Sequence, residues 1–192
     1  MRSLSIVFMA AGIFIVGFAC FKIFDSQMQT SESLEKAKEM METSSNTNIH
    51  MEKVQKFELS AGEAVGILEI PRLEAKLPIV EGTDNESLEK GVGHYTGSYY
   101  PGENGQIVLS GHRDTVFRGA GKLKNGDELI LQLPYGKFFY EIIDTEIVDK
   151  DDRSIITLQN DEEELILTTC YPFTYVGNAP ERYIIYAKKS VL

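Results

Sequence analysis

An uncharged apolar run near the N-terminus most constrains what this chain can fold into. The run covers residues 4–21, with Arg2 before it and Lys22 after it. A helix of this length lies near the minimum that spans a hydrocarbon core of about 30 Å. The Lys22 side chain can reach the interface, so the span can extend to Phe24. We therefore expect a transmembrane helix that serves as a membrane anchor over residues 1–24.

Two other interpretations of this run are weaker. A secretory signal peptide usually has a shorter apolar core, followed by a cleavage site with small residues. The segment Gly17-Phe18-Ala19-Cys20 resembles a lipoprotein cleavage box, but it lacks the aliphatic residue expected three positions before the cysteine. The flanking charges of Arg2 and Lys22 oppose each other and leave the orientation of the span open.

Residues 25–60 have the composition of a polar stalk or linker, rich in Ser, Glu, Lys and Met. We expect a flexible spacer here. The alternative is a short amphipathic helix that packs on the domain, because Leu34, Ala37, Met40 and Met41 recur at helical spacing. The polar segment 44–48 is expected to end such a helix.

Residues 61–192 have globular composition and the length of one domain. Short runs of branched and aromatic residues predict strands, separated by Gly, Pro and Asp turns, at 65–70, 77–80, 107–111, 129–133, 138–148, 165–170 and 182–186. Thr83 with Glu86 three residues later forms a capping box, which predicts a helix over 84–90. The pattern indicates a mainly β barrel or sandwich and does not choose between them.

The charge balance excludes some partners. Asp and Glu number 29 against 19 Lys and Arg, a net charge of −10, so a nucleic-acid interface is not expected. Acidic runs at 149–152 and 161–164 lack the residue order of a calcium loop, and such runs are usually solvated. We expect no cofactor and no metal, with calcium as a minor alternative at these runs. Cys20 and Cys170 are the two cysteines, and no intramolecular disulfide is expected between them.

Cys170 and His112 are the candidate reactive pair. Cys170 ends the apolar strand 165–170, and such a cysteine is often a small buried hydrophobe. A catalytic thiol needs a partner that accepts or donates a proton, and a donor for the oxyanion. His112 follows the end of another apolar strand, and Arg182 lies where the strand pattern resumes after Cys170. His94 lies in a loop-rich region and is expected to be a hydrogen-bonded structural residue.

Three short motifs together resemble a known family. They are G-H-R-D-T at 111–115, L-T-T-C-Y-P at 167–172 and Arg182-Tyr183. This signature resembles that of the sortases, the cysteine transpeptidases of Gram-positive surfaces. The run from Cys170 through V-G-N-A-P at 176–180 resembles class D in particular. The resemblance covers roughly residues 66–188.

The resemblance implies a fold and a site. The fold would be a closed eight-stranded β-barrel with short helices, preceded by the transmembrane helix. Cys170 would be the nucleophile that forms an acyl-thioester, and His112 the proton donor and acceptor. Arg182 would stabilise the oxyanion or position the substrate. Thr169 and Ser110 would border the peptide groove.

The resemblance also implies partners and a location. Substrates would be surface proteins with a C-terminal L-P-x-T-[Gly/Ala] sorting signal, cleaved after Thr and transferred to an amine of peptidoglycan or lipid II. The catalytic domain would lie outside the cell, on a single-pass anchor in the cell membrane. A pilin-polymerising sortase is an alternative, although the Asp-Pro-aromatic lid common in class C is absent from the sequence. The second alternative is a non-catalytic surface-binding domain in which Cys170 is inert.

Overall fold

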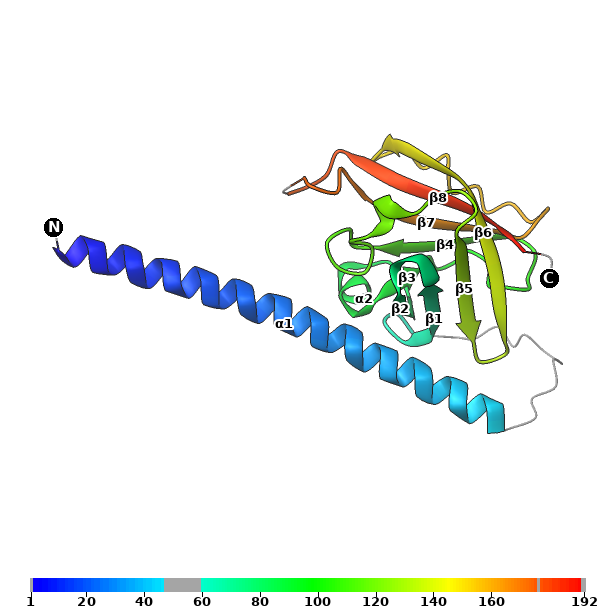
Figure 1. Cartoon of the computed structure of the whole chain (residues 1–192), viewed down its shortest axis with the longest axis horizontal. Helices are drawn as coiled ribbons and strands as arrows, with labels where there is room; N and C mark the ends of the chain where they lie inside the picture. The colour runs from blue at the N-terminus through cyan, green and yellow to red at the C-terminus, as the bar shows by residue number, and fades with distance from the viewer. Residues whose placement is uncertain (1, 47–59, 176, 191–192) are drawn as a thin grey trace.

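The computed structural model describes residues 2–46, 60–175 and 177–190. Eight strands close into a barrel in the order β1-β2-β3-β4-β7-β8-β6-β5 (Figure 1). The elements are, in chain order, α1 (Arg2–Asn46), β1 (Ala64–Ile70), η1 (Pro71–Leu73), β2 (Ala75–Glu81), α2 (Asn85–Lys90), β3 (Val92–His94), β4 (Gln106–Gly111), η2 (Ala120–Lys122), β5 (Glu128–Leu133), β6 (Gly136–Asp149), β7 (Glu164–Tyr171) and β8 (Glu181–Lys189). The closed barrel that the resemblance implied is confirmed.

Two of the eight strand pairings are parallel, and one of them organises the site. β2 pairs with β3 and β4 pairs with β7 in parallel, while the other neighbours are antiparallel. Parallel neighbours need a long connection. The connection from β4 to β7 contains β5 and β6. The C-terminal ends of β4 and β7 therefore meet at one rim of the barrel.

The core fills the barrel with alternate residues of the strands. On β7, Leu165 and Leu167 belong to the interior cluster, whereas Ile166 packs on the outer face with Val148 and Ile184. This alternation is the period of two that a strand imposes on its side chains. Odd positions of β7 therefore face inward, and even positions face outward.

The helix α1 is longer than the sequence pattern predicted. It runs without a break from Arg2 to Asn46, past the barrel beside β1, β2 and α2 (Figure 1). Its apolar part is exposed, with Ile6 62% accessible. Among the described residues it is the one helix with the length and hydropathy to cross a membrane.

The polar part of α1 packs on the domain, so the expected flexible spacer is wrong for residues 25–46. Ala37 is fully buried and Ser33 is nearly so, and the Thr30 hydroxyl lies 3.3 Å from the backbone oxygen of Glu89 in α2. A salt bridge between Lys36 and Glu32, four residues apart, lies on the exposed face. The alternative of a helix that packs on the domain is the one found, although the helix is longer than expected. The helix is described as far as Asn46, and residues 47–59 lie outside the described ones, so its predicted end at 44–48 stays a prediction.

Two smaller expectations are also corrected. The helix at 84–90 is confirmed as α2, but its N-cap is Asp84, not Thr83. The Asp84 carboxylate accepts from the backbone N–H groups of Glu86 and Ser87 and from the Ser87 hydroxyl at 2.6 Å, which makes it the better cap. β3 was not predicted, because it is three residues long and contains Gly93.

Candidate active site

The rim where β4 and β7 end brings the two candidate reactive residues together. The last pair in the β4–β7 register is Gly111 with Thr169. The Thr169 hydroxyl donates a 2.7 Å hydrogen bond to the backbone oxygen of Gly111 and fastens the two strands at this point. The next residues along the chain are His112, directly after β4, and Cys170 of β7. The strand ends therefore present an imidazole and a thiol side by side on one rim.

Cys170 also has a fixed neighbour on its other side. In the antiparallel pairing of β7 with β8, Cys170 lies directly opposite Arg182. Directly opposed side chains share one face of the sheet, with Cβ atoms about 5 Å apart. Both residues occupy outward positions by the alternation of their strands, and both are partly exposed. Cys170 is a free cysteine.

The guanidinium of Arg182 is held by backbone oxygens. Its Nη1 donates to the oxygen of Glu181 at 3.0 Å and to that of Ala179 at 3.4 Å. Arg182 forms no salt bridge with any residue that the structure describes. One nitrogen is thus fixed, and the other donors of its planar fork can bind an oxygen anion.

The two residues predicted to border the groove lie at the same rim. Thr169 is only 4% exposed, because it occupies an inward position, and its hydroxyl binds within the protein. Ser110 is partly exposed and lies opposite Thr168 of β7. A contact of either residue with a peptide stays a prediction.

Arg113 was not singled out by the sequence, and it links the two halves of the site. From the position next to His112, its guanidinium reaches the loop after Cys170. Nη2 donates to the backbone oxygens of Tyr175 at 2.5 Å and Gly177 at 2.9 Å, and Nη1 to that of Pro172 at 3.3 Å. The charge also lies 5.9 Å from the centre of the Tyr175 ring. Its place within the G-H-R-D-T motif was the available signal.

Aromatic side chains stabilise the same loop from the barrel side. The Phe173 ring makes edge contacts with Tyr171 and Tyr183, at centroid distances of 5.5 Å and 5.3 Å. It also covers Gly121, where a Cβ would lie 2.8 Å from the ring. The start of the loop after β7, at Phe173, is therefore packed against the barrel next to the site.

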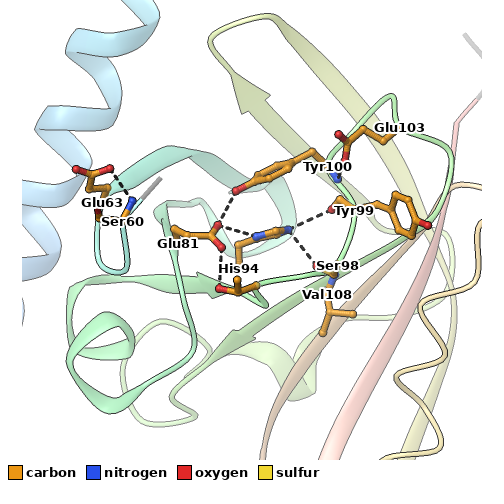
Figure 2. Close-up of polar contacts among 10 residues, drawn as sticks. Ser60, Glu63, Glu81, His94, Ser98, Tyr99, Tyr100, Glu103 and Val108 are labelled. Atoms are coloured by element: carbon orange, nitrogen blue, oxygen red, sulfur yellow. Dashed lines mark hydrogen bonds and ion pairs between the residues drawn. The ribbon is translucent and has the colours of Figure 1, made fainter. Parts of the chain in front are cut away.

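His94 is the structural histidine that the sequence predicted. It is 2% exposed. Its Nδ1 lies 2.8 Å from a Glu81 carboxylate oxygen, and its Nε2 lies 3.1 Å from the Tyr99 oxygen and 3.0 Å from the Ser98 hydroxyl. Figure 2 shows this network, which ties β2, β3 and the loop after β3 together. The ring also stacks on Tyr100 at 4.1 Å.

Glu81 is the acceptor at the centre of that network. Burial alone would raise the pKa of this carboxyl group, but hydrogen bonds from His94, Tyr100 and Thr96 outweigh burial and hold its pKa below the ordinary value of 4.5. Partial burial raises the pKa of the Tyr100 hydroxyl most, and its hydrogen bond to Glu81 raises that pKa further. The network stabilises the ionised carboxylate.

The carboxylates of the run 149–152 contact mainly neighbouring residues of the same loop, whereas Glu162 and Glu163 of the run 161–164 form salt bridges with Lys188 and Lys189 of β8. Asp149 and Asp152 accept from N–H groups two residues further along the chain, and Asp151 pairs with Lys150. Across residues 2–46, 60–175 and 177–190, the structure assembles no group of three or more His, Cys, Asp or Glu that could hold a metal ion. The expectation of no cofactor and no metal, with calcium as a minor alternative at these runs, stays a prediction.

Comparison with known proteins is consistent with this geometry. A sequence profile of the Sortase domain matches residues 68–190. Sortase D of Bacillus subtilis strain 168 is 59% identical over 187 residues, 94% of each chain. A solved Clostridium perfringens Sortase D5 transpeptidase superposes with a TM-score of 0.74 at 27% identity, over 85% of this chain and 99% of its own. A Clostridium perfringens sortase C, solved with the C-terminal cell wall sorting motif, gives 0.65 at 27% identity, over 84% and 89%.

The barrel and the matched domain define a class of enzyme. The chain belongs to the sortase family, whose members are cysteine transpeptidases. Within the family it groups with class D, because the similarity to a class D relative extends over nearly the whole chain. The alternative of a non-catalytic surface-binding domain is thereby set aside.

Proposed function

We propose that this protein is a membrane-anchored sortase of the cell surface that uses Cys170, His112 and Arg182. It cleaves an L-P-x-T-[Gly/Ala] sorting signal after Thr and transfers the protein to an amine of peptidoglycan or lipid II. The observation that supports this most is the double register at the rim. Gly111 pairs with Thr169 just before His112 and Cys170, and Cys170 pairs with Arg182.

The first step forms the acyl-enzyme. The Cys170 thiolate attacks the carbonyl carbon of Thr in the sorting signal, and the oxygen takes up the negative charge. Arg182 donates to that oxygen, which stabilises the charge where it develops. The C–N bond then breaks, and His112 gives its proton to the leaving amine. The products are a thioester on Cys170, a neutral imidazole and a free C-terminal fragment.

The second step transfers the acyl group. A neutral acceptor amine attacks the thioester carbon, the C–S bond breaks, and the electron pair stays on the Cys170 sulfur. His112 takes the surplus proton from the amine nitrogen. The thiolate and the protonated imidazole are restored, so the cycle needs no cofactor.

Anchoring and substrate follow from supporting observations. The exposed apolar part of α1 has the length of a single-pass anchor, and an enzyme that acts on the wall needs its domain outside the cell. The Clostridium sortase C was solved with a C-terminal cell wall sorting motif, which supports the same kind of substrate here. The recipients of the transfer are then amines of peptidoglycan or its lipid-linked precursor.

Intact mass spectrometry tests the proposal. The full chain in detergent, incubated with a peptide containing L-P-x-T-G or L-P-x-T-A, is expected to gain the mass of the peptide up to Thr, with the adduct on Cys170. Adding an amine should remove the adduct and yield the matching amide. Cys170→Ala should abolish the adduct, whereas Cys20→Ala, a change in the exposed part of α1, should not. A wild-type chain that binds the peptide but forms neither adduct nor amide would contradict the proposal.

A further inference from the structure

His112 opens into a cavity that the anchor helix helps to form. The cavity has a volume of about 240 Å³ and is lined by Lys22, Asp25 and Ser26 of α1, Glu89 of α2, and His112 and Asp114 after β4. Neither Cys170 nor Arg182 lines it. It therefore lies on the α1 and α2 side of the imidazole, away from the β7–β8 pair.

The helix that forms this wall is docked on the domain by contacts further along its length. Ser33 and Ala37 are buried against the barrel, and Thr30 contacts the oxygen of Glu89. Glu89 itself lines the cavity, so the docking contact and the cavity share a residue. The position of Lys22 to Ser26 beside His112 thus follows from how α1 packs.

The cavity also lies close to where the apolar run ends. Phe21 is the last residue of the uncharged run, and Asp25 follows it by one helical turn, roughly 6 Å along the axis at 1.5 Å per residue. In a chain anchored by this run, the cavity opens at the membrane surface.

We propose that this cavity receives the acceptor amine, so that the anchor helix forms one wall of the acceptor site. The inference rests on the proposed function, in which His112 must contact the amine nitrogen to take its proton. A cavity of this size admits a side-chain amine and excludes a folded partner. Its carboxylates, Asp25, Glu89 and Asp114, outnumber the single ammonium of Lys22, and this balance attracts a protonated amine before it gives one proton to solvent.

Filling the cavity provides a steric test with a matched control. In the full chain in detergent, Ser26→Trp places a large ring in the cavity, and Ser31→Trp places the same ring at an exposed position of α1. The acyl-enzyme is formed first with an L-P-x-T-G peptide, and its decay is then followed with hydroxylamine or with a peptide that carries a lysine-like side-chain amine. We expect Ser26→Trp to slow transfer to the peptide amine about tenfold or more, a loss of about 1.4 kcal/mol of transition-state stabilisation. Formation of the adduct and decay with hydroxylamine should change little.

Reversing a charge provides the second test. Asp25→Lys should raise the KM for the cationic amine severalfold with little change in the maximal rate, because it weakens attraction of the charge and leaves His112 in place. Glu32→Gln, on the exposed face, should leave this KM unchanged.

The outcomes separate the two proposals. No adduct in the wild type would overturn the proposed function itself. A normal adduct together with unchanged transfer to the peptide amine in both Ser26→Trp and Asp25→Lys would overturn only the acceptor site. Equal loss of adduct formation and transfer in both variants would also overturn it, because the helix would then act on His112 and not on the acceptor.

Discussion

His94 is the last residue of β3 and His112 follows the last residue of the paired strand β4, and the two side chains have opposite surroundings. Both ring nitrogens of His94 have hydrogen-bond partners and the ring is buried. The ring of His112 is partly exposed and forms no hydrogen bond with any residue that the structure describes.

This difference has a physical consequence. Moving a proton at His94 would disturb a buried carboxylate, a carbonyl and a hydroxyl at once, which is costly where the surroundings are fixed. At His112 a proton can be gained or lost without breaking a bond within the protein. We therefore infer that His94, whose ring nitrogens both have hydrogen-bond partners, stabilises the fold. His112, whose ring nitrogens have none among the described residues, is the histidine suited to proton transfer.

Replacing each histidine by alanine tests this division of roles, and it should give the largest effects. His112→Ala should lower the rate of adduct formation by about 10²- to 10⁴-fold, as for the loss of a general acid, with an unchanged free energy of unfolding. His94→Ala should lower the free energy of unfolding by about 2 to 3 kcal/mol, because it removes one hydrogen bond to the buried Glu81 carboxylate, which keeps only those from Tyr100 and Thr96. Its rate per folded molecule should stay close to that of the wild type.

Chemical denaturation and single-turnover mass spectrometry on both variants check this pair. If His94→Ala does not fold, the rate of adduct formation is measured on His94→Asn, which keeps a hydrogen-bond donor at this position. A large rate loss in folded His94 variants would contradict the division of roles.

A smaller effect is expected from the two arginines near the rim. Arg182→Lys should slow adduct formation on the order of 10²-fold, because a point charge cannot keep the backbone contacts and also donate to the oxyanion. Arg118 is the matched control, since it is exposed and its Nε and Nη2 both bind the Asp114 oxygen. Lysine can retain one such bond, so Arg118→Lys should change the rate less than threefold, within the effect of one surface hydrogen bond. An equal loss of rate in Arg182→Lys and Arg118→Lys would contradict the role of Arg182 in stabilising the oxyanion.

The sequence predicted the strands of the barrel better than their closure. Seven of the eight strands were identified, because each carries a run of branched side chains with turn residues at its ends. Closure into a barrel could not be read from that pattern, since it depends on the pairing of β1 with the distant β5. The family resemblance supplied it.

Long-range geometry accounts for what was missed at the site. The pairing of Cys170 with Arg182 was not among the misses, because the strand pattern resumes at Arg182 after the loop and places it opposite Cys170. The role of Arg113 depends on backbone oxygens about 60 positions away in the chain, and a carbonyl carries no sequence signal. A packed helix was one alternative for residues 25–60, but its position beside His112 was not predicted, because helical spacing does not say which part of the domain a helix contacts.

Titrating the His94 network gives the smallest effect and sharpens the comparison. Because the pKa of Glu81 is held below its ordinary value of 4.5, its ionised form contributes stability that is fully present above about pH 4.5 and is lost as the pH falls through the lowered folded-state value. Glu81→Gln should therefore be less stable than the wild type at pH 7, by about 1 to 2 kcal/mol for the weakened hydrogen bonds.

The difference between Glu81→Gln and the wild type should narrow as the pH is lowered from 5 toward 3, where the wild-type carboxylate takes up a proton. Urea denaturation at pH 7, 5, 4 and 3 measures it. Glu141→Gln is the control, because Glu141 is exposed on β6 and the change should have little effect at any of these values. A difference for Glu81→Gln that stays constant from pH 7 to pH 3 would mean that the network does not favour the ionised carboxylate. The hydrogen bonds on both ring nitrogens of His94 would then be a result of how the side chains pack, with no preference for the ionised form of Glu81.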